Sequence, residues 1–513
     1  MQAIRLKNLR SFLDTGVVPL NKINVFVGQN SSGKSTFLRT FPLLRQSVLR
    51  DTRGPILWYD DTLVDFGSYE EAKSRHANDK DGIHFGFRIS LDPQRGRYYY
   101  YDTISLRNES IADIDIEIFE HNKKNYIGKI RILIEDHEIL IEANNIGQVK
   151  SFQVNGSNML FTEGTHNLIK YDTVGLIPQM LILTKTEKRI NREYYLQKCR
   201  EIIKSIIGKR LKNEYRITRM ITDLTFDKKE NILNSLKHES SILTWVKKIK
   251  NWNLETAEFI QLNNLIVAHY TSSILGVIDN KLKTYFDGCQ YIAPIRAKAI
   301  RYYRRQDLSV SEIDAYGDNL HMFLDNLNKK QMESYQNFVK DVFDFIPSTE
   351  SSKGHITINI EDQNGEKFNI TDLGFGYSQI LPIITKLWYT FSDNERPRNP
   401  WEPREKNITL LIEQPELHLH PAMQAQLADA FILATEHAKS NDVNLKLIIE
   451  THSSVIINRI GRRVIEKKLD SSAVSVTLFQ LDAELKNSTI KSTNFNENGV
   501  LVNWPIGFFE PNN

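Results

Sequence analysis

Residues 23 to 40, INVFVGQNSSGKSTFLRT, predict a short buried strand, a glycine-bounded loop and the start of a helix. Gly28, Gly33, Lys34 and Ser35 match the phosphate-loop pattern G-x-x-x-x-G-K-[ST] in the strand–loop–helix context that this pattern requires. The glycines let backbone N–H groups curve around a polyphosphate, and the helix N-terminus adds partial positive charge. Lys34 would contact the β- and γ-phosphates, and the Ser35 hydroxyl would bind Mg²⁺. We expect a nucleoside triphosphate here, bound by Gly28, Asn30, Ser32, Gly33, Lys34, Ser35 and Thr36.

Length and composition indicate a multidomain protein of the reducing cytosol. The chain has 513 residues, 41% of them hydrophobic and 25% charged, so we expect roughly two to four domains. It contains no run of 18 apolar residues, and its first residues, MQAIRLKNLRSF, lack the pattern of a signal peptide. The two cysteines, Cys199 and Cys289, are too few for a disulfide framework or a metal cluster. We therefore expect a cytoplasmic protein with no membrane partner.

The net charge of +3 conceals an asymmetry along the chain. Residues 185–250 contain eighteen Lys and Arg against eight Asp and Glu, so the rest of the chain is acidic. A basic segment of this kind favours contact with a polyanion, either DNA or RNA. A solvated helical face explains the same charges equally well, and both interpretations stay open.

The segments beyond the phosphate loop differ in their patterns. Residues 82–162 contain IHFGFRISL, RYYYYDTISL, DIDIEIFE and EILIEAN between polar clusters, which predicts an antiparallel meander. After Ile190 apolar residues recur at spacings of three and four, which predicts helices. After Tyr291 apolar strands precede helices, as in a parallel sheet covered on both faces. The expected division is 1–75 and 291–513 for a split nucleotide domain, 76–165 for a β-rich lobe and 166–290 for a basic helical insertion. Pro42 should kink or break the first helix.

Two apolar strands in the C-terminal part end in reactive side chains. ITLLIEQPELHLHP places Glu413 at the end of a buried strand, followed by Gln414 and Glu416. A carboxylate at that position beside the phosphate loop can hold Mg²⁺, and we assign this role to Glu413 together with Ser35. LKLIIETHSS ends in His452, which we expect to touch the γ-phosphate or orient the attacking water. Without the phosphate loop, a structural role for this histidine would be favoured.

Two further histidines, His418 and His420, follow the acidic strand in ELHLHP. Imidazoles bind zinc and similar metals, but no cysteine lies near these two. We therefore favour a role in shaping the turn over a metal site.

A Gly-rich loop precedes an apolar helix in NITDLGFGYSQILPIITKLW, residues 369–388. Gly374 and Gly376 permit close backbone approach, and Ser378 and Gln379 would supply side-chain hydrogen bonds. Such a helix N-terminus can bind a phosphate presented by another subunit. The loop is weak evidence by itself, because many loops begin helices in this way.

In this order the motifs resemble those of ABC-class ATPases of the kind shared by SMC, RecF and OLD-family proteins. IEQPELHLHP (412–421), DLGFGYSQILP (372–382) and the ending WPIGFF (504–509) are similar to stand-alone bacterial members. YIAPIRAKAIRYY resembles the stretch that begins their second lobe. The resemblance covers residues 1–75 and 290–513 but not the insertion. The layout is also similar to that of PtuA-like ATPases from Septu and retron anti-phage systems.

The resemblance implies an α/β fold, namely a split ABC-type P-loop ATPase head. In such a head a mixed or parallel sheet is flanked by helices. A β-rich lobe and a helical region would be inserted into it. It implies ATP and Mg²⁺ as cofactors and at least a homodimer. Lys34, Ser35 and Glu413 of one subunit would face residues 374–379 of its partner. The sequence departs from the family pattern at two positions. Gln414 stands where the family has a catalytic Glu directly after the carboxylate that binds Mg²⁺. Gly374 stands where the signature loop of the family usually has Ser. Either Glu416 serves as the base or hydrolysis is slow, with ATP mainly a clamp and Gln414 orienting water.

The first functional hypothesis is a dimerising ATP switch that senses a trigger and controls a separate effector, a nuclease, in anti-phage defence. No nuclease signature follows the ATPase motifs in the sequence, which implies that the effector is another chain. The alternative is a DNA-maintenance ATPase that contacts DNA through residues 185–250, and a transporter ATPase subunit is less favoured. We also expect a basic cluster on the second lobe near the dimer contact, formed by Arg296, Lys298, Arg301, Arg304 and Arg305.

Overall fold

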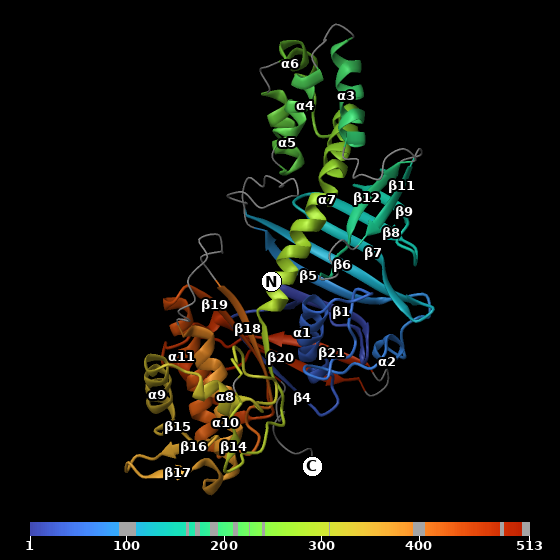
Figure 1. Cartoon of the computed structure of the whole chain (residues 1–513). Helices are drawn as coiled ribbons and strands as arrows, with labels where there is room; N and C mark the ends of the chain where they lie inside the picture. Colours follow the sequence, from blue (N-terminus) through green and yellow to red (C-terminus); the bar gives the residue numbers. More distant parts are fainter. Residues whose placement is uncertain are drawn as a thin grey trace. The chain divides into compact units, whose positions relative to one another are not determined.

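A computed structural model describes residues 1–91, 109–160, 164–169, 175–184, 193–208, 214–224, 226–238, 242–306, 308–392, 406–482 and 487–504. The chain forms two compact units, each described here by itself (Figure 1). Unit 1 comprises Met1–Leu9, Ser47–Trp58 and Gly67–Thr284, and unit 2 comprises Arg10–Gln46, Tyr59–Phe66 and Tyr285–Asn513. Among the helices in these ranges, none is both long enough and apolar enough to cross a bilayer.

Unit 2 is built on a six-stranded sheet in the order β13-β18-β19-β4-β20-β21. Its first five strands are parallel, and β21 pairs antiparallel at one edge. All six residues of β4 are buried, as expected for a central strand of a parallel sheet, and five of them are apolar or glycine. Because β4 lies between two C-terminal strands, the predicted α/β fold with a split nucleotide domain is confirmed. The strands are β13 (Cys289–Ile292), β18 (Lys406–Glu413), β19 (Val443–Glu450), β4 (Ile23–Gly28), β20 (Val474–Leu481) and β21 (Ser488–Thr493).

Helices follow the strands of this sheet and supply most of its apolar cover. Helix α1 (Lys34–Leu49) follows β4, α11 (Pro421–Ser440) follows β18, and α12 (Ser454–Ile465) follows β19. Helix α10 (Phe375–Phe391) packs against α11 and β19. Pro42 lies inside α1, which continues to Leu49, so the helix does not break at this proline, and the kink expected as the alternative stays a prediction.

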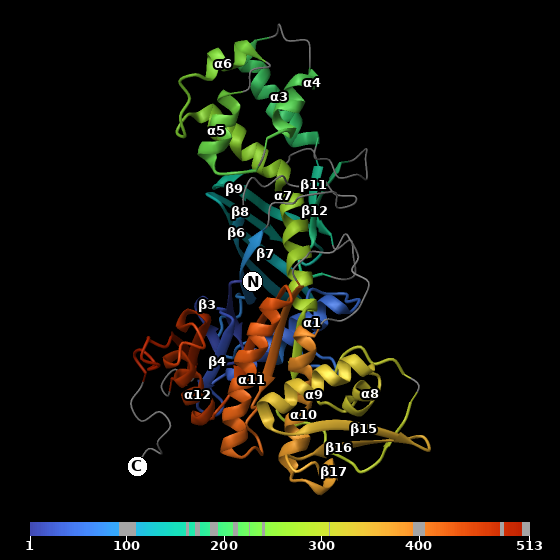
Figure 2. The same ribbon diagram turned by 90° about the vertical axis from the view of Figure 1, so that its left-hand side faces the viewer.

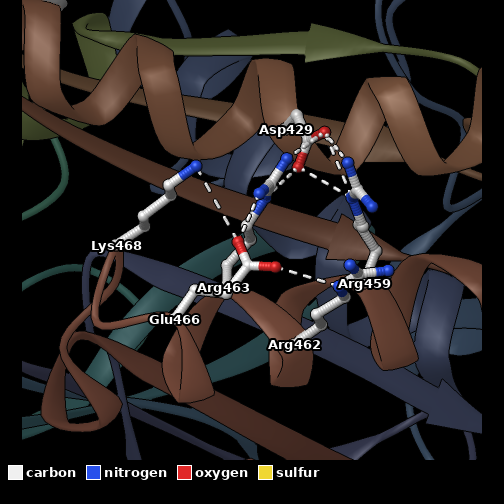
Figure 3. Close-up of polar contacts among 6 residues, drawn as sticks. All are labelled: Asp429, Arg459, Arg462, Arg463, Glu466 and Lys468. Carbon is white, nitrogen blue, oxygen red and sulfur yellow. Dashed lines mark hydrogen bonds and ion pairs between the residues drawn. The ribbon is translucent and has the colours of Figure 1, made fainter.

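An ion-pair cluster ties α11 to α12 (Figure 3). The Asp429 carboxylate on α11 contacts the guanidinium groups of Arg459 and Arg463 on α12, with a closest N–O distance of 2.6 Å to each. Burial opposes ionisation of Asp429, but the hydrogen bonds from Arg463 and Arg459 lower its pKa overall. Glu466, the C-cap residue of α12, accepts a further bond from Arg462 at 2.9 Å. The cluster therefore links the helices that follow the two strands ending in glutamate.

A smaller antiparallel sheet completes unit 2, in the order β14-β16-β15 with β17 beside β16. Helices α8 (Leu320–Asp325) and α9 (Lys329–Phe343) pack against it. Its strands are β14 (Tyr303–Arg304), β15 (Ile346–Ser352), β16 (His355–Glu361) and β17 (Lys367–Asn369). Two short strands, β2 (Phe12–Asp14) and β3 (Val18–Pro19), precede β4 in the chain.

Unit 1 contains the predicted antiparallel meander, in the order β10-β9-β8-β7-β6-β5-β1. Apolar residues alternate with polar ones from Ala112 to Ile118 in β6, and the apolar residues of this stretch are buried. The expected strand RYYYYDTISL lies outside the described residues. The strands are β1 (Ala3–Leu9), β5 (Ile83–Leu91), β6 (Ser110–His121), β7 (Lys124–Ile134), β8 (His137–Ala143), β9 (Val149–Val154) and β10 (Ser157–Asn158), with a separate pair β11 (Gly164–Ile169) and β12 (Gln179–Thr184).

Helices α3 to α7 of unit 1 follow the meander in the chain, as the sequence predicts. Helix α7 (Ala257–Asp287) runs beside the strands of the meander in both views (Figures 1 and 2). Its Asn264 accepts a hydrogen bond from Asn155 and donates one to Ser157, at 2.7 and 3.0 Å. The other helices are α2 (Tyr69–Ala72), α3 (Glu193–Ile207), α4 (Glu214–Thr222), α5 (Lys229–Lys237) and α6 (Leu243–Ile249).

Candidate nucleotide-binding site

The phosphate loop joins the end of β4 to the start of α1, and two of its residues must be glycine. A Cβ on Gly28 would lie 2.3 Å from the carbonyl oxygen of Phe479 in the neighbouring strand β20. Gly33 has φ +93°, and a Cβ there would lie 2.6 Å from the ring of Phe12. Both positions therefore exclude a side chain, and the loop can bend tightly into α1. The first N–H groups of α1 have no acceptor within the helix, which suits them to an anion.

Lys34, the first residue of α1, has its side chain folded back over the loop. Its Nζ donates to the carbonyl oxygens of Gly28 and Gln29 at 3.1 and 2.7 Å, and the residue is 3% exposed. Burial lowers the pKa of Lys34, while the charges of Glu450 and Glu416 oppose that shift. The ammonium group of Lys34 is thus held at the phosphate loop, where it can neutralise charge on a bound polyphosphate.

Two glutamates end the neighbouring parallel strands β18 and β19 at the same level. Glu413 is the register partner of Glu450, and Glu450 in turn pairs with Phe26 of β4. The Ser35 hydroxyl donates to Glu450 Oε1 at 2.8 Å. Burial and then the charge of Glu413 raise the pKa of Glu450 to about 7, against the opposing effect of the Ser35 hydrogen bond. The phosphate-loop serine therefore contacts Glu450, not Glu413.

Glu413 has a full set of partners of its own. Arg39 on α1 binds both of its carboxylate oxygens at 2.7 Å, and the Tyr291 hydroxyl donates to Oε1 at 2.8 Å.

The side chain of Arg296 donates to the backbone oxygen of Glu413 at 2.8 Å. Arg296 is 2% exposed, and the expected place of its basic cluster near a dimer contact stays a prediction. Burial lowers its pKa to about 10.

The residues after Glu413 and after Glu450 bind one another. Gln414 has φ 43° and donates its N–H to the Glu450 carbonyl at 2.8 Å. Glu416 accepts hydrogen bonds from the Thr451 hydroxyl at 2.7 Å and from the His452 N–H at 2.6 Å. Burial raises the pKa of Glu416, although these bonds oppose the shift. A carboxyl whose pKa is raised by burial is suited to accept a proton, as the alternative assignment of Glu416 requires.

His452 is exposed in the turn between β19 and α12, at the edge of the site. Burial of its ring and the charge of Lys34 lower its pKa, so the neutral imidazole is favoured near neutral pH. His420 caps α11 by accepting the Ala422 N–H at 3.3 Å, and the His418 ring lies edge-on against Phe375. Among the described residues, no group of three or more His, Cys, Asp or Glu could hold a metal by itself. A metal at this site would need ligands from a nucleotide and water.

The Gly-rich loop lies at the N-terminus of α10, but its polar side chains turn inward. Ser378 donates to the Phe375 carbonyl at 2.7 Å. Gln379 is 2% exposed, and its amide bonds the backbone N–H and C=O of Arg296 at 3.4 and 3.3 Å. Gln379 is thus bonded within its own subunit, and its expected hydrogen bond to a partner's phosphate stays a prediction. A Cβ on Gly374 would meet nothing within 4 Å, and one on Gly376 would lie 3.0 Å from the His418 carbonyl.

Three residues of this site were missed by the sequence analysis, Glu450, Arg39 and Tyr291, and Arg296 was expected only in a basic cluster. Arg39 had a readable signal, because it lies four residues after Ser35 and so shares its face of α1. Glu450 ends its apolar strand as Glu413 does, in LIIETHS. Of the WPIGFF ending only Trp504 is described, and it packs against the core of unit 2.

A glycine-bounded phosphate loop beside two parallel strands that end in glutamate defines a P-loop ATPase. A family model described as an AAA ATPase domain matches residues 1–457, and the chain belongs to this family. Its residues fit ATP and Mg²⁺, since Lys34 and the α1 N-terminus suit the phosphates and Ser35 and a carboxylate suit the metal. A search of curated proteins finds no match.

Solved structures similar to this chain include several SMC heads. The SmcHead bound to the C-winged helix domain of ScpA is 11% identical with a TM-score of 0.33, covering 97% of this chain and 98% of that one. The SMC head domain from Thermotoga maritima is 9% identical, with a TM-score of 0.33 and coverages of 96% and 98%. The Smc head domain with a coiled coil and joint from Pyrococcus yayanosii is 10% identical, with a TM-score of 0.33 and coverages of 97% for both chains. The family model, not these similarities, carries the assignment.

Proposed function

We propose that the chain is an ATP-dependent dimerising switch that hydrolyses ATP slowly and controls a separate effector, a nuclease, in anti-phage defence. Membership of the ATPase family accounts for ATP as the ligand. The switch and its slow turnover rest on the residues around Glu413. The defence role and the effector rest on the resemblance of the motifs to PtuA-like ATPases.

The observation that carries slow turnover is the identity and bonding of Gln414 and Glu416. Gln414 directly follows Glu413, and an amide cannot take a proton from water as a carboxylate can. The nearest alternative base, Glu416, has one oxygen bonded to the Thr451 hydroxyl and the other to the His452 N–H. These hydrogen bonds hold Glu416 in place and oppose the rise of its pKa, which makes it a weaker base. Hydrolysis should therefore be slow enough for bound ATP to act as a clamp.

The dimer follows from the position of the Gly-rich loop on α10. Gly374 is open on the side where a Cβ would stand, which leaves room for a partner's phosphate near the N-terminus of α10. Exposed apolar side chains lie in and around this loop and in residues 295–308, and a second subunit would bury them: Ile295, Ile300, Tyr302, Leu308 and Phe375. At least a homodimer in a head-to-tail arrangement satisfies both features.

Hydrolysis and mass measured under the same conditions test this proposal. We expect turnover below about 1 s⁻¹, the low end of the usual enzyme range, and a doubling of mass by light scattering with a non-hydrolysable ATP analogue. Glu416→Gln should slow turnover further if Glu416 is the base, and Gln414→Ala should do so if Gln414 orients the water. A fast wild-type enzyme that stays monomeric with the analogue would contradict the switch.

The same experiment with added DNA distinguishes the second candidate, a DNA-maintenance ATPase. Exposed Arg216 and Arg219 on α4 favour it, although Arg219 also pairs with Asp223 at 2.9 Å. Lys209, Arg210 and Lys212, which contribute to the predicted basic surface, lie outside the described residues. Stimulation of hydrolysis by DNA, lost steeply with added salt, would favour this candidate over a separate effector.

A further inference from the structure

Glu450 is the one site carboxylate that no part of the proposed function uses. It ends β19 in register with Phe26 of β4, the strand that leads into the phosphate loop. Its Oε1 accepts the hydroxyl hydrogen of Ser35, the residue expected to bind Mg²⁺. The side chain therefore reaches the metal position of the loop from the neighbouring strand.

The second oxygen of Glu450 has no partner. Oε2 is buried without a hydrogen bond, in a residue that is 1% exposed. Leaving a buried carboxylate oxygen unsatisfied is costly, and such a group in a native site calls for a ligand. It belongs to a carboxylate whose other oxygen contacts the phosphate-loop serine, and carboxylate oxygens are ligands that Mg²⁺ prefers.

Glu413 differs from Glu450 in this respect. Both of its oxygens accept from the Arg39 fork, and Oε1 also accepts from Tyr291. A metal could use Glu413 only by competing with a bidentate arginine, which is among the strongest partners of a carboxylate. Of two glutamates at the same level of the sheet, one is neutralised within the protein and the other has a free oxygen.

We propose that Glu450, together with Ser35, binds the Mg²⁺ of MgATP, and that Glu413 is a positioning residue held by Arg39 and Tyr291. This reassigns the metal-binding role predicted for Glu413. The inference rests on the proposed binding of ATP at this loop. Mg²⁺ is commonly held by one or two carboxylates together with phosphate and water oxygens, so Glu450 and Ser35 suffice as protein ligands.

Metal binding is measured without hydrolysis, on the full-length chain. Calorimetry gives the affinity for ATP with Mg²⁺ and with EDTA, and the ratio of the two is the metal advantage. Electron paramagnetic resonance of Mn²⁺ with ATP reports the bound metal directly. We expect Glu450→Gln to reduce the metal advantage by about tenfold or more, comparable with known losses of metal-site residues. Its affinity for metal-free ATP should be unchanged or higher, because a negative charge near the phosphates is removed.

Three further variants make the result specific. Glu450→Asp keeps a carboxylate and should retain part of the metal advantage. Glu436→Gln, at an exposed position of α11, should behave as wild type. Glu413→Gln should keep most of the metal advantage. Thermal unfolding without metal checks the fold, and Glu450→Gln should melt no lower than wild type because it removes an unsatisfied buried charge.

Two outcomes would overturn the inference. If Glu450→Gln keeps the wild-type metal advantage while Glu413→Gln loses it, the ligand is Glu413 and only the inference fails. If the wild-type chain binds no ATP with or without Mg²⁺, the proposed function fails together with it.

Discussion

Arg39 and Glu413 form a bidentate ion pair in the site. Glu413 is 1% exposed, and its charge is compensated by a guanidinium on the phosphate-loop helix. The hydrogen bonds that Arg39 donates to Glu413 raise the pKa of Arg39 well above its ordinary value, although burial opposes the shift. The pair thus connects the end of β18 to α1 directly.

Removing Arg39 should destabilise unit 2. Arg39→Leu leaves a buried carboxylate with the Tyr291 hydroxyl as its remaining side-chain donor, at an expected cost of about 2 kcal/mol, because Arg39 is itself partly exposed. A loss of this size lowers the melting temperature by several degrees. Adding Glu413→Gln should restore part of the loss, since the uncompensated charge is then gone.

Differential scanning calorimetry measures both variants, with Lys330→Leu at an exposed position of α9 as a control. If Arg39→Leu melts at the wild-type temperature, the ion pair contributes nothing and Glu413 is free to serve as a metal ligand.

At the level of elements, the cluster around Asp429 should make the stability of unit 2 depend on pH. The folded-state pKa of Asp429 is lowered by its hydrogen bonds, against the effect of burial. A lowered acid pKa gives stability that is present above the ordinary value of about 4 and is lost as pH falls through the folded value. Asp429→Asn should therefore melt below wild type at pH 7, and the difference should shrink below about pH 4.

Melting temperatures of wild type and Asp429→Asn between pH 3 and 7 test this expectation. Asp341→Asn, at an exposed position of α9, is the matched control and should show no such pH-dependent difference. A constant difference across this range would mean that the charge of Asp429 is not what joins α11 to α12.

The elements that the sequence predicted best are those with an unambiguous pattern. The buried run of β4, the glycines of the phosphate loop and the alternation in β5 to β8 each permit one local structure. Helix α1 continues past Pro42 to Leu49, so the break expected at this proline does not occur. The contact of Gln379 with Arg296 joins segments 83 residues apart, which no local pattern records. Glu450 required the register of β18 with β19, which only the assembled sheet gives.

For the whole molecule, the sheet of unit 2 joins strands from both ends of the chain. Between α1 and β13 the chain contributes the meander and helices of unit 1, and then returns to complete the ATPase sheet. The phosphate loop and the two glutamates therefore meet only after most of the chain is in place. The central claim is that this assembled site binds ATP through the phosphate loop.

Calorimetric titration of MgATP into the full-length chain and its Lys34→Ala variant tests this claim most directly. Lys34 supplies the cationic group at the loop, so its loss should weaken ATP binding by about tenfold or more, as expected for a charge-assisted hydrogen bond. Lys330→Ala on the exposed face of α9 should bind as wild type, and circular dichroism should confirm that Lys34→Ala is folded. We predict saturable binding by the wild type and a clear loss in Lys34→Ala. Equal affinity in the two proteins would contradict nucleotide binding at this loop.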